Sequence, residues 1–455
     1  MFTLCKMISS SALLALCISL GAPALPALGA VSLKDTVKYT LDYNPTVKSF
    51  QEYRQAARHD LQRARSDWFP RVDARAGYGT EQWNDAINRG GRPAQSTSKY
   101  YERHTSSIVV SQIIWDGMAT WNRVTLNEQR LDSARTRLFD NAEALSLDAV
   151  LAHIEVFRQR QLLQLADLNV NNHKQILASQ RERQVSGAST MADVTQTESR
   201  LARTEASKVE TRSALEVAIA NYQRLTGRDP NNIETPSTPA SAYPSLEVAL
   251  LHGQVGNLKI RTSQHDLDAA RTQIELDKAP FHPTITLDWS TNYNWQVQSS
   301  RTWEYGNSLM LNLNWNLFRG GYDSYNVKGD KARARQAKRD LQVQQDLITE
   351  ETTSTWSQYM SARDQARFFA DAVNYSTKTR DMYLEQFNVG QRSLLDVLDA
   401  ENEVFTSAIQ LVTAQQNVIA AQFRLLALGG ELLANFDIDR NELVINTDNT
   451  GFNHR

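Results

Sequence analysis

Residues 284–295 read TITLDWSTNYNW, and residues 308–317 read SLMLNLNWNL. Apolar and polar residues alternate in both segments, and a period of two is typical of β-strands with one apolar and one polar face. A similar alternation over Val72–Tyr78 predicts a third strand. Residues 108–115 predict a fourth strand, but Gln112 interrupts the alternation and leaves the facing of this strand open.

Aromatic residues mark the apolar faces of these strands. Trp289, Tyr293 and Trp295 lie on one such face, and Trp315 lies on another. In water these faces would need a covering layer, and the chain has no spare segment of matching length. Strands of about ten residues with apolar outer faces, polar inner faces and aromatic ends are instead typical of outer-membrane β-barrels. Single-chain barrels have at least about eight strands, and eight leave an interior just wide enough for side chains. An open pore built from four strands per chain therefore predicts that three or more copies share one barrel.

The chain contains a long tandem repeat. Residues 112–227 and 315–430 align at a constant separation of 203, so that Gly187 corresponds to Gly390. Upstream of Trp115 the separation becomes 213, which places ten extra residues in a loop of the first copy. The repeat is far longer than the roughly 20–50 residues of solenoid units, and it therefore indicates a duplicated half-molecule.

Long helices are expected where proline, which breaks helix interiors, is absent. Residues 94–229 and 284–455 contain no proline. Within the first of these regions, apolar residues recur at spacings of three and four and predict a single helix of about 100 Å. Every seventh residue from Val397 to Leu425 is apolar, which predicts a helix packed in a cylinder of coiled coils.

These patterns together predict a membrane protein of mixed α and β structure. Each protomer would give four transmembrane β-strands to a shared barrel, which a long α-helical barrel continues into the periplasm. The expected organisation is a signal peptide over 1–29, a first repeat over 30–227, a proline-rich linker over 228–244, a second repeat over 245–430 and a polar tail over 431–455. The first repeat is expected to contain short helices at about 33–43 and 45–66, a β-hairpin at about 71–115, and helices over 118–184 and 189–226. The second repeat is expected to contain a helix over 245–279, a β-hairpin at about 284–318, and helices over 322–387 and 393–428.

The N-terminus has the features of a secretory signal peptide. Lys6 precedes an apolar run over Ile8–Leu20, which is too short to span a bilayer as a lasting helix. Cys5 and Cys17, the two cysteines, both fall inside this segment. The processed chain is therefore expected to form neither a disulfide nor a thiolate metal site.

Composition argues against several classes of function. The formal net charge of −2 does not suggest a nucleic-acid partner. No phosphate-binding loop, nucleophile elbow or zinc motif is present, so we expect no cofactor, no metal and no enzymatic activity. The histidines show no ligand spacing and are expected to lie on the surface; they stand at positions 59, 104, 153, 173, 252, 265, 282 and 454.

Residues 389–400 read VGQRSLLDVLDA. Through this run, the tandem repeat and the paired hairpins, the chain resembles the TolC family of trimeric outer-membrane exit ducts over about residues 32–430. The resemblance implies a twelve-stranded barrel shared by three protomers and an α-helical tunnel. It also implies a periplasmic aperture that meets an inner-membrane transporter and its adaptor protein.

Asp396 and Asp399 lie three residues apart and so share one face of the predicted helix. In a threefold assembly they would form two stacked rings of carboxylates. Such rings attract cations and resist tight closure unless Arg392 or bound cations bridge them. Two carboxylates at this spacing more often belong to a solvated helix face, but the resemblance favours the aperture.

The resemblance also implies that a tyrosine two residues before the Val-Gly-x-Arg block, together with the arginine, holds neighbouring hairpins closed. Phe387 occupies that tyrosine position here and has no hydroxyl group. One hydrogen bond, which would reach toward Asp193, is therefore missing. Closure is expected to depend on Arg392 or on packing.

Gly187 and Gly390 are expected at the free tips of the helical hairpins, where a positive φ is useful. Asp193, just beyond the first tip, either supports adaptor docking or the gate, or is simply an acid at a helix N-terminus. Aromatic anchors at the two membrane surfaces are expected at Trp68, Trp115, Trp289, Trp295, Trp315 and Phe318.

We therefore predict the outer-membrane exit duct of a type I protein secretion system. Its expected partners are two further copies of the chain, a periplasmic adaptor, an inner-membrane ABC transporter or other pump, and outer-membrane lipid. The exit duct of a drug or metal efflux pump is the main alternative, because cargo is chosen chiefly by the inner-membrane partner. A periplasmic coiled-coil scaffold is a third reading, but a scaffold would not need four amphipathic strands.

Overall fold

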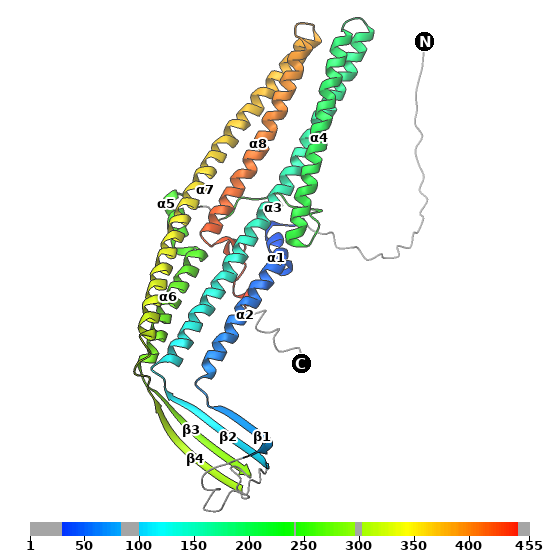
Figure 1. The fold of residues 1–455 in the computed structure, drawn as a ribbon. Coiled ribbons are helices and arrows are strands. Elements are labelled where there is room, and N and C mark those ends of the chain that lie inside the picture. The colour runs from blue at the N-terminus through cyan, green and yellow to red at the C-terminus, as the bar shows by residue number, and fades with distance from the viewer. Residues whose placement is uncertain (1–29, 83–99, 241–242, 296–302, 445–455) are drawn as a thin grey trace, which may run out of the picture.

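The computed structural model describes residues 30–82, 100–240, 243–295 and 303–444. The predicted signal peptide, most of the loop with the ten extra residues and the end of the tail lie outside these residues. The described chain is elongated, with one β-sheet at one end and two helical hairpin turns at the other (Figure 1). None of the described helices has the length and apolar content needed to cross a membrane.

The sheet joins both repeats. Its four antiparallel strands follow the order β1 (Arg71–Glu81), β2 (Tyr101–Trp115), β3 (Thr284–Trp295) and β4 (Trp303–Asn314). The strand expected over 308–317 begins earlier, because Trp303 pairs with Trp295 at the hairpin end. Within the described residues β1 and β4 each pair along one edge only, so the sheet is open on both sides.

One face of the sheet is apolar and the other polar. Leu287 and Trp289 of β3 lie opposite Leu311 and Leu309 of β4 on the apolar face. On the polar face, the hydroxyl groups of Ser290 and Ser308 form a 2.8 Å hydrogen bond, and Asp288 accepts hydrogen bonds from Ser111 and Asn312.

The pairing of β2 settles the facing that the sequence left open. Gln112 pairs with Leu287, so it lies on the apolar face, where its amide donates to the carbonyl oxygens of Trp68 at 3.2 Å and Ile113 at 2.9 Å. A bulge after Ile113 then returns Trp115 to the apolar face, opposite Ile285.

Two helices of 67 residues dominate the molecule, α3 (Ala119–Val185) and α7 (Tyr322–Asn388). At about 1.5 Å per residue each reaches about 100 Å. Farther from the sheet, α4 (Met191–Thr226) packs back against α3, and α8 (Leu394–Leu428) packs between α3 and α7. The two long helices therefore connect the sheet with the hairpin turns.

Nearer the sheet, α2 (Pro45–Ser66) packs against α3, and α6 (Leu258–Lys278) packs between α3 and α7. The helices thus form an open arc along the whole length of the helical part of the molecule, with α7 at one edge (Figure 1). The other edge is α2 near the sheet and α4 near the turns.

The prediction of one helix over 245–279 is wrong. The segment contains α5 (Leu246–Gly256) and α6, separated by Asn257 in an extended conformation. The Asn257 side chain accepts hydrogen bonds from the backbone N–H groups of Lys259 and Ile260, which caps α6 and breaks the helix. Asn44, its counterpart in the first repeat, separates α1 (Leu33–Tyr43) from α2 in the same way.

The prediction of a polar tail from residue 431 is also wrong for the described part. The short helix α9 (Leu432–Asn435) and the segment that follows it to residue 444 pack on α3 and α8. Leu432 and Leu433 are fully buried, and Phe423 stacks on Phe436. These apolar residues are too few and too irregularly spaced to show a period, so only the folded chain reveals the contribution to the core.

Two histidines expected on the surface are buried instead. His153 is fully inaccessible, and its ring nitrogens form hydrogen bonds with Thr36 Oγ1 at 2.9 Å and the Glu234 carbonyl oxygen at 3.0 Å. Burial lowers the pKa of His153 to about 4. His173 is also buried and bonds the carbonyl oxygen of Asn169 one turn earlier. His153 therefore satisfies polar groups between α3 and its neighbours, whereas the bond of His173 stays within α3.

Glu143 of α3 is buried beneath the C-terminal segment. Its carboxylate accepts a hydrogen bond from the backbone N–H of Leu433 at 3.2 Å and lies 2.7 Å from a guanidinium nitrogen of Arg440. Burial raises the pKa of Glu143 to about 7, and the positive charge of Arg440 limits the rise. The segment is therefore held by a titratable group.

Docking of this segment is expected to depend on pH. Because the folded pKa of Glu143, about 7, lies above the ordinary value of 4.5, docking is strongest below pH 4.5 and weakens as the pH rises through 7. We expect the protection of the Leu432–Asn435 amides against hydrogen exchange, corrected for intrinsic rates, to fall roughly 10- to 100-fold between pH 5 and pH 8. Glu143→Gln should remove most of this change. Equal protection of the unaltered protein at both pH values would contradict the assignment.

Candidate functional site

The two helical hairpin turns lie side by side at the end of the molecule opposite the sheet (Figure 1). Gly187 lies between α3 and α4, and Gly390 lies between α7 and α8. Each has a φ of +78° and open space around it. Side chains with a Cβ rarely adopt this backbone conformation, so both turns need glycine. The turns are thus exposed tips on rigid helices.

Asp193 is fully engaged within its own turn. Its carboxylate accepts hydrogen bonds from the backbone N–H of Thr190 at 3.1 Å, the Thr190 hydroxyl at 2.8 Å and the Ser189 hydroxyl at 3.2 Å. The bond from the Thr190 N–H is the main reason that its pKa lies below the ordinary range. This geometry is a capping box, and it favours the reading of Asp193 as an acid at a helix N-terminus.

Arg392 contacts only groups of its own hairpin among the described residues. Its Nε donates to Oε1 of Gln386 at 3.1 Å, its guanidinium lies 4.2 Å from the centre of the Tyr383 ring, and one nitrogen is 3.7 Å from Asp396. Arg392 therefore ties the end of α7 to the start of α8. In a single protomer it does not bridge the two hairpins.

Phe387 makes a contact that the sequence did not predict. The guanidinium of Arg183, near the end of α3, lies 4.3 Å from the centre of its ring. A cation over an aromatic face is attracted by the ring's quadrupole. This contact joins the two hairpins without a hydroxyl group, at the place where the predicted tyrosine bond is missing.

Asp399 also joins the hairpins. Its carboxylate lies 2.7 Å from a guanidinium nitrogen of Arg200 on α4, and the Asp399 side chain is 60% exposed. Asp396 lies one helical turn after Arg392, and its carboxylate is 3.7 Å from a guanidinium nitrogen of that residue. Each of the two predicted aperture acids therefore has its own basic partner. Within the described residues no cluster of acidic and histidine side chains is arranged to hold a metal ion.

A buried polar cluster lies between the hairpins, farther from the tips. Glu401 of α8 has a side chain that is only 7% exposed. It accepts hydrogen bonds from Arg380 of α7 at 3.2 Å and from the amide of Asn172 of α3. The cluster borders a cavity of about 350 Å³, which Phe387 also lines. At the repeat separation of 203, Glu401 corresponds to Glu198, but the sequence gives no sign of its contacts because its neighbours come from distant helices.

The predicted membrane-surface aromatics fall into three groups. Trp68, Trp115, Trp315 and Phe318 lie where the strands meet the helices, and the Trp315 indole donates to the carbonyl oxygen of Phe281 at 3.1 Å. Trp295 lies at the other end of the sheet. Trp289 is in the middle of β3, between Val110 and Leu309, so it belongs to the apolar band rather than to either surface.

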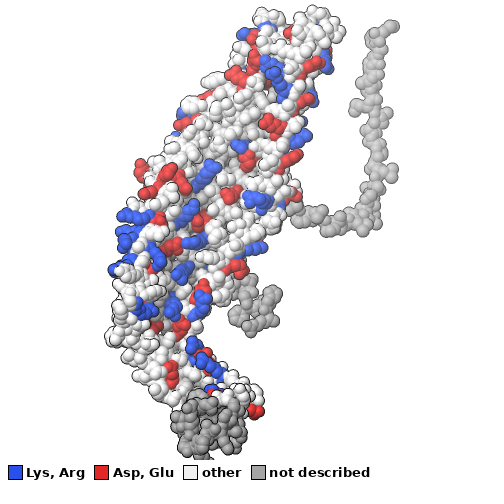
Figure 2. Space-filling model, viewed as in Figure 1, with Lys and Arg blue, Asp and Glu red and all other residues white. Residues whose placement is uncertain are grey.

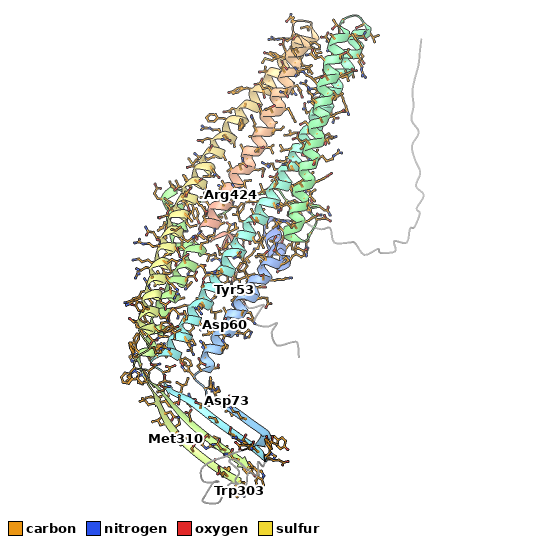
Figure 3. The ribbon with its side chains drawn as sticks, in the orientation of Figure 1. Tyr53, Asp60, Asp73, Trp303, Met310 and Arg424 are labelled. Carbon is orange, nitrogen blue, oxygen red and sulfur yellow. The ribbon has the colours of Figure 1, made fainter. Side chains whose placement is uncertain are left out.

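Two further aromatic residues belong to these bands. Trp303 pairs with Trp295 at the far end of the sheet, where Figure 3 labels it, and Trp121 of α3 packs against Trp68 with ring centres 6.3 Å apart. The position of Trp303 could have been predicted from sequence, because Trp303, Tyr305 and Leu309 share one phase of the two-residue alternation. Trp121 lies in α3, beyond the alternating residues of β2, so the alternation gave no sign of its position.

The chain is similar to known outer membrane proteins in sequence. The chain matches the family model for outer membrane efflux proteins over residues 37–228 and 254–431. It is 27% identical over 353 residues to the outer membrane efflux protein BepC of Brucella suis, with 76% of each chain covered. It is 23% identical over 448 residues to the proteases secretion protein PrtF of Dickeya chrysanthemi, with 92% of each chain covered.

The fold is also found in solved structures. The outer membrane protein VceC of Vibrio cholerae matches with a TM-score of 0.76 and 17% sequence identity, over 88% of this chain and 96% of that chain. The outer membrane channel CmeC of Campylobacter jejuni matches with the same TM-score, over 91% of this chain and 89% of that chain.

Removing the contact between Arg183 and Phe387 is expected to loosen the tips. An exposed cation–π contact contributes about 0.5–1 kcal/mol, so Arg183→Ala should shift an equilibrium between closed and open tips about two- to fivefold per protomer. We expect a higher single-channel conductance or open probability in planar bilayers. Arg181→Ala is the matched control, since Arg181 pairs with Glu198 inside its own hairpin. Equal effects of both variants would rule out a specific role for the contact.

Loss of Glu401 is expected to separate the hairpins. Glu401→Ala leaves the largely buried Arg380 with only its contact to Asp381, at a cost of about 1–3 kcal/mol. Spin labels on Ala188→Cys and Gln391→Cys can report the distance between the tips, because the two native cysteines lie in the predicted signal peptide. The distance distribution should broaden in Glu401→Ala. It should stay unchanged in Glu198→Ala, which alters the exposed counterpart in α4.

Proposed function

The chain belongs to the outer membrane efflux protein family, and on this premise we propose that three copies form the exit duct of a type I protein secretion system. In this proposal an ABC transporter in the inner membrane drives an unfolded protein through the duct. A periplasmic adaptor would join the two. The duct itself is passive.

Family membership settles the coarser predictions. The predicted resemblance, the mixed α and β channel fold, the outer-membrane location with an extension into the periplasm, and a transport rather than an enzymatic role are confirmed. The cargo, the partners and the number of subunits are the proposed part.

The open sheet is the observation that carries the proposal. A strand edge in hydrocarbon leaves backbone N–H and C=O groups without partners, so β1 and β4 need further strands. Pairing β4 of one copy with β1 of the next would close a ring, and three copies give the smallest barrel with room for a pore. β3 and β4 have 12 residues each, and at about 3.4 Å per residue with a tilt of about 40° they span roughly 30 Å, the thickness of a bilayer core.

The edge of the helical arc supports the same closure. α7 exposes a row of apolar side chains, including Tyr325, Val343 and Leu347. Such a row is expected to pack on α2 and α4 of the next copy. A scaffold that worked as a single chain would leave it in water.

Two relatives favour different cargoes. PrtF, a proteases secretion protein, aligns over 92% of both chains, which supports protein secretion. BepC, an outer membrane efflux protein, has the higher identity of 27% and supports the second candidate, the exit duct of an efflux pump.

A deletion strain distinguishes these candidates. For secretion, loss of the gene should remove at least one large protein from the medium or the cell surface and leave drug sensitivity within about twofold. For efflux, secreted proteins should be unchanged and sensitivity should rise. Detergent extracts of outer membranes should contain a heat-modifiable trimer in either case. A water-soluble monomer would exclude both candidates and favour the scaffold.

A further inference from the structure

The first part of α7 carries a dense group of basic residues. Lys328, Lys331, Arg335, Lys338 and Arg339 are all exposed, and we name them the α7 basic face. Figure 2 shows blue side chains gathered along this edge of the molecule. The whole chain has a formal net charge of −2, so the positive charge here is local.

The charges of the α7 basic face repel one another. Lys331 and Arg335 are four residues apart, as are Arg335 and Arg339, and these spacings bring side chains together on a helix. Within the described part of the chain, Lys331, Arg335 and Lys338 make no ion pair with an acidic residue, and the lysine at 328 lies over the Tyr325 ring instead. The isolated protomer thus contains a destabilising concentration of like charge that an external anion would relieve.

The first repeat shows that the fold does not require a positive charge at positions 331 and 335. At a separation of 203, Lys331 corresponds to Glu128 and Arg335 corresponds to Asp132 of α3. The same position in the same helical architecture is therefore acidic in one copy and basic in the other. Glu128 pairs with Arg65 of α2 at 2.8 Å, which accounts for the acid in the first copy. Lys331 and Arg335 have no acidic partner among the described residues, so no contact within the protomer accounts for the basic pair in the second copy.

Contacts of α5 show which side of α7 is basic. The amide of Gln254 on α5 donates to the carbonyl oxygen of Gln345 at 3.0 Å and to the hydroxyl of Thr349 at 2.7 Å. Counting back in sevens from Gln345 gives positions 338 and 331. Counting back from Thr349 gives positions 342, 335 and 328. Residues seven apart lie on nearly the same side of a helix, so the α7 basic face points to the side where α5 lies. In a closed tube α5 must lie outside, because it would otherwise fill the lumen.

The position along α7 indicates where the partner lies. α7 begins at Tyr322, directly after the aromatic residues at the end of the sheet. Lys328 lies about 9 Å and Arg339 about 25 Å along the helix from this point. The headgroup layer on each side of a bilayer is about 6 Å thick, so lipid reaches at most the first of these residues. An anion that neutralises the rest of the α7 basic face would therefore lie in the periplasm, close to the membrane.

We propose, on the basis of the trimeric duct proposed above, that the α7 basic face binds the carboxylate-bearing peptides of the cell-wall peptidoglycan. Three such faces would form a collar around the outside of the duct below the membrane. A meshwork through which the tube passes meets it from all sides at one level, as a collar requires. The contact anchors the duct and neutralises the repulsion between the basic residues.

Co-sedimentation with purified peptidoglycan sacculi tests the proposal. The full-length protein in detergent is expected to sediment with sacculi at low salt, and about tenfold less at 0.5 M NaCl because salt screens exposed charges. The swap variant Lys331→Glu/Arg335→Asp, which copies the first repeat, should bind at least tenfold more weakly. Lys331→Gln/Arg335→Gln should lie between the two. Sacculi whose carboxylates have been amidated should not bind the unaltered protein.

The matched control is Arg203→Glu/Arg212→Asp, which makes the same charge change at two exposed positions of α4. It should bind sacculi like the unaltered protein. Equal binding by the swap variant, equal loss in the control, or binding of the unaltered protein to phosphatidylglycerol vesicles in preference to sacculi would each overturn the proposal. The swap variant should remain a heat-modifiable trimer with normal export. If the unaltered protein forms no trimer, the duct itself is wrong; if the trimeric swap variant still binds sacculi, only the collar is wrong.

Discussion

Backbone hydrogen bonding in a medium without water is the constraint on which the rest of the structure depends. A strand that enters hydrocarbon must pair on both edges, because no solvent can satisfy its N–H and C=O groups. This chain supplies four strands and leaves β1 and β4 each unpaired on one side within the described residues. The sheet is thus incomplete as a membrane structure, and the helical arc is incomplete at the same two edges. Both the sheet and the helical arc therefore require further copies of the chain at these edges, arranged around a common axis.

The duplication explains how one chain can meet two such different solvents. Each copy continues from a hairpin with an apolar face into a 67-residue helix whose exposed surface is largely polar. The apolar period of two ends at the aromatic residues where strands meet helices. Because α3 and α7 run uninterrupted from the sheet to the tips, a change in how the helices pack at one end can reach the other without crossing a flexible joint.

Sequence patterns predicted what depends on local periodicity. The strands, the two long helices and the turns at Gly187 and Gly390 follow from alternation, absence of proline and the need for a positive φ. The break at Asn257 was visible in the repeat, since Asn44 already divides the corresponding helices, and the continuous helix predicted there ignored that correspondence. The partners of Phe387, Asp399 and Glu401 could not be predicted, because they depend on how α3 and α4 are rotated against α7 and α8. No spacing along one helix encodes that rotation.

The same reasoning separates the two copies by function. The backbones of the two copies correspond, but the contacts differ. Asp193 is held in the capping box of its own turn, whereas its counterpart Asp396 lies near Arg392. Asp399, one helical turn after Asp396, pairs with Arg200 of the other hairpin. Glu198 pairs at the surface, whereas its counterpart Glu401 is buried between helices. Duplicated positions thus share a local conformation and differ in what they contact. Each contact between the hairpins joins one group of the first copy to one group of the second. Movement of either hairpin relative to the other would therefore change the opening at the tips.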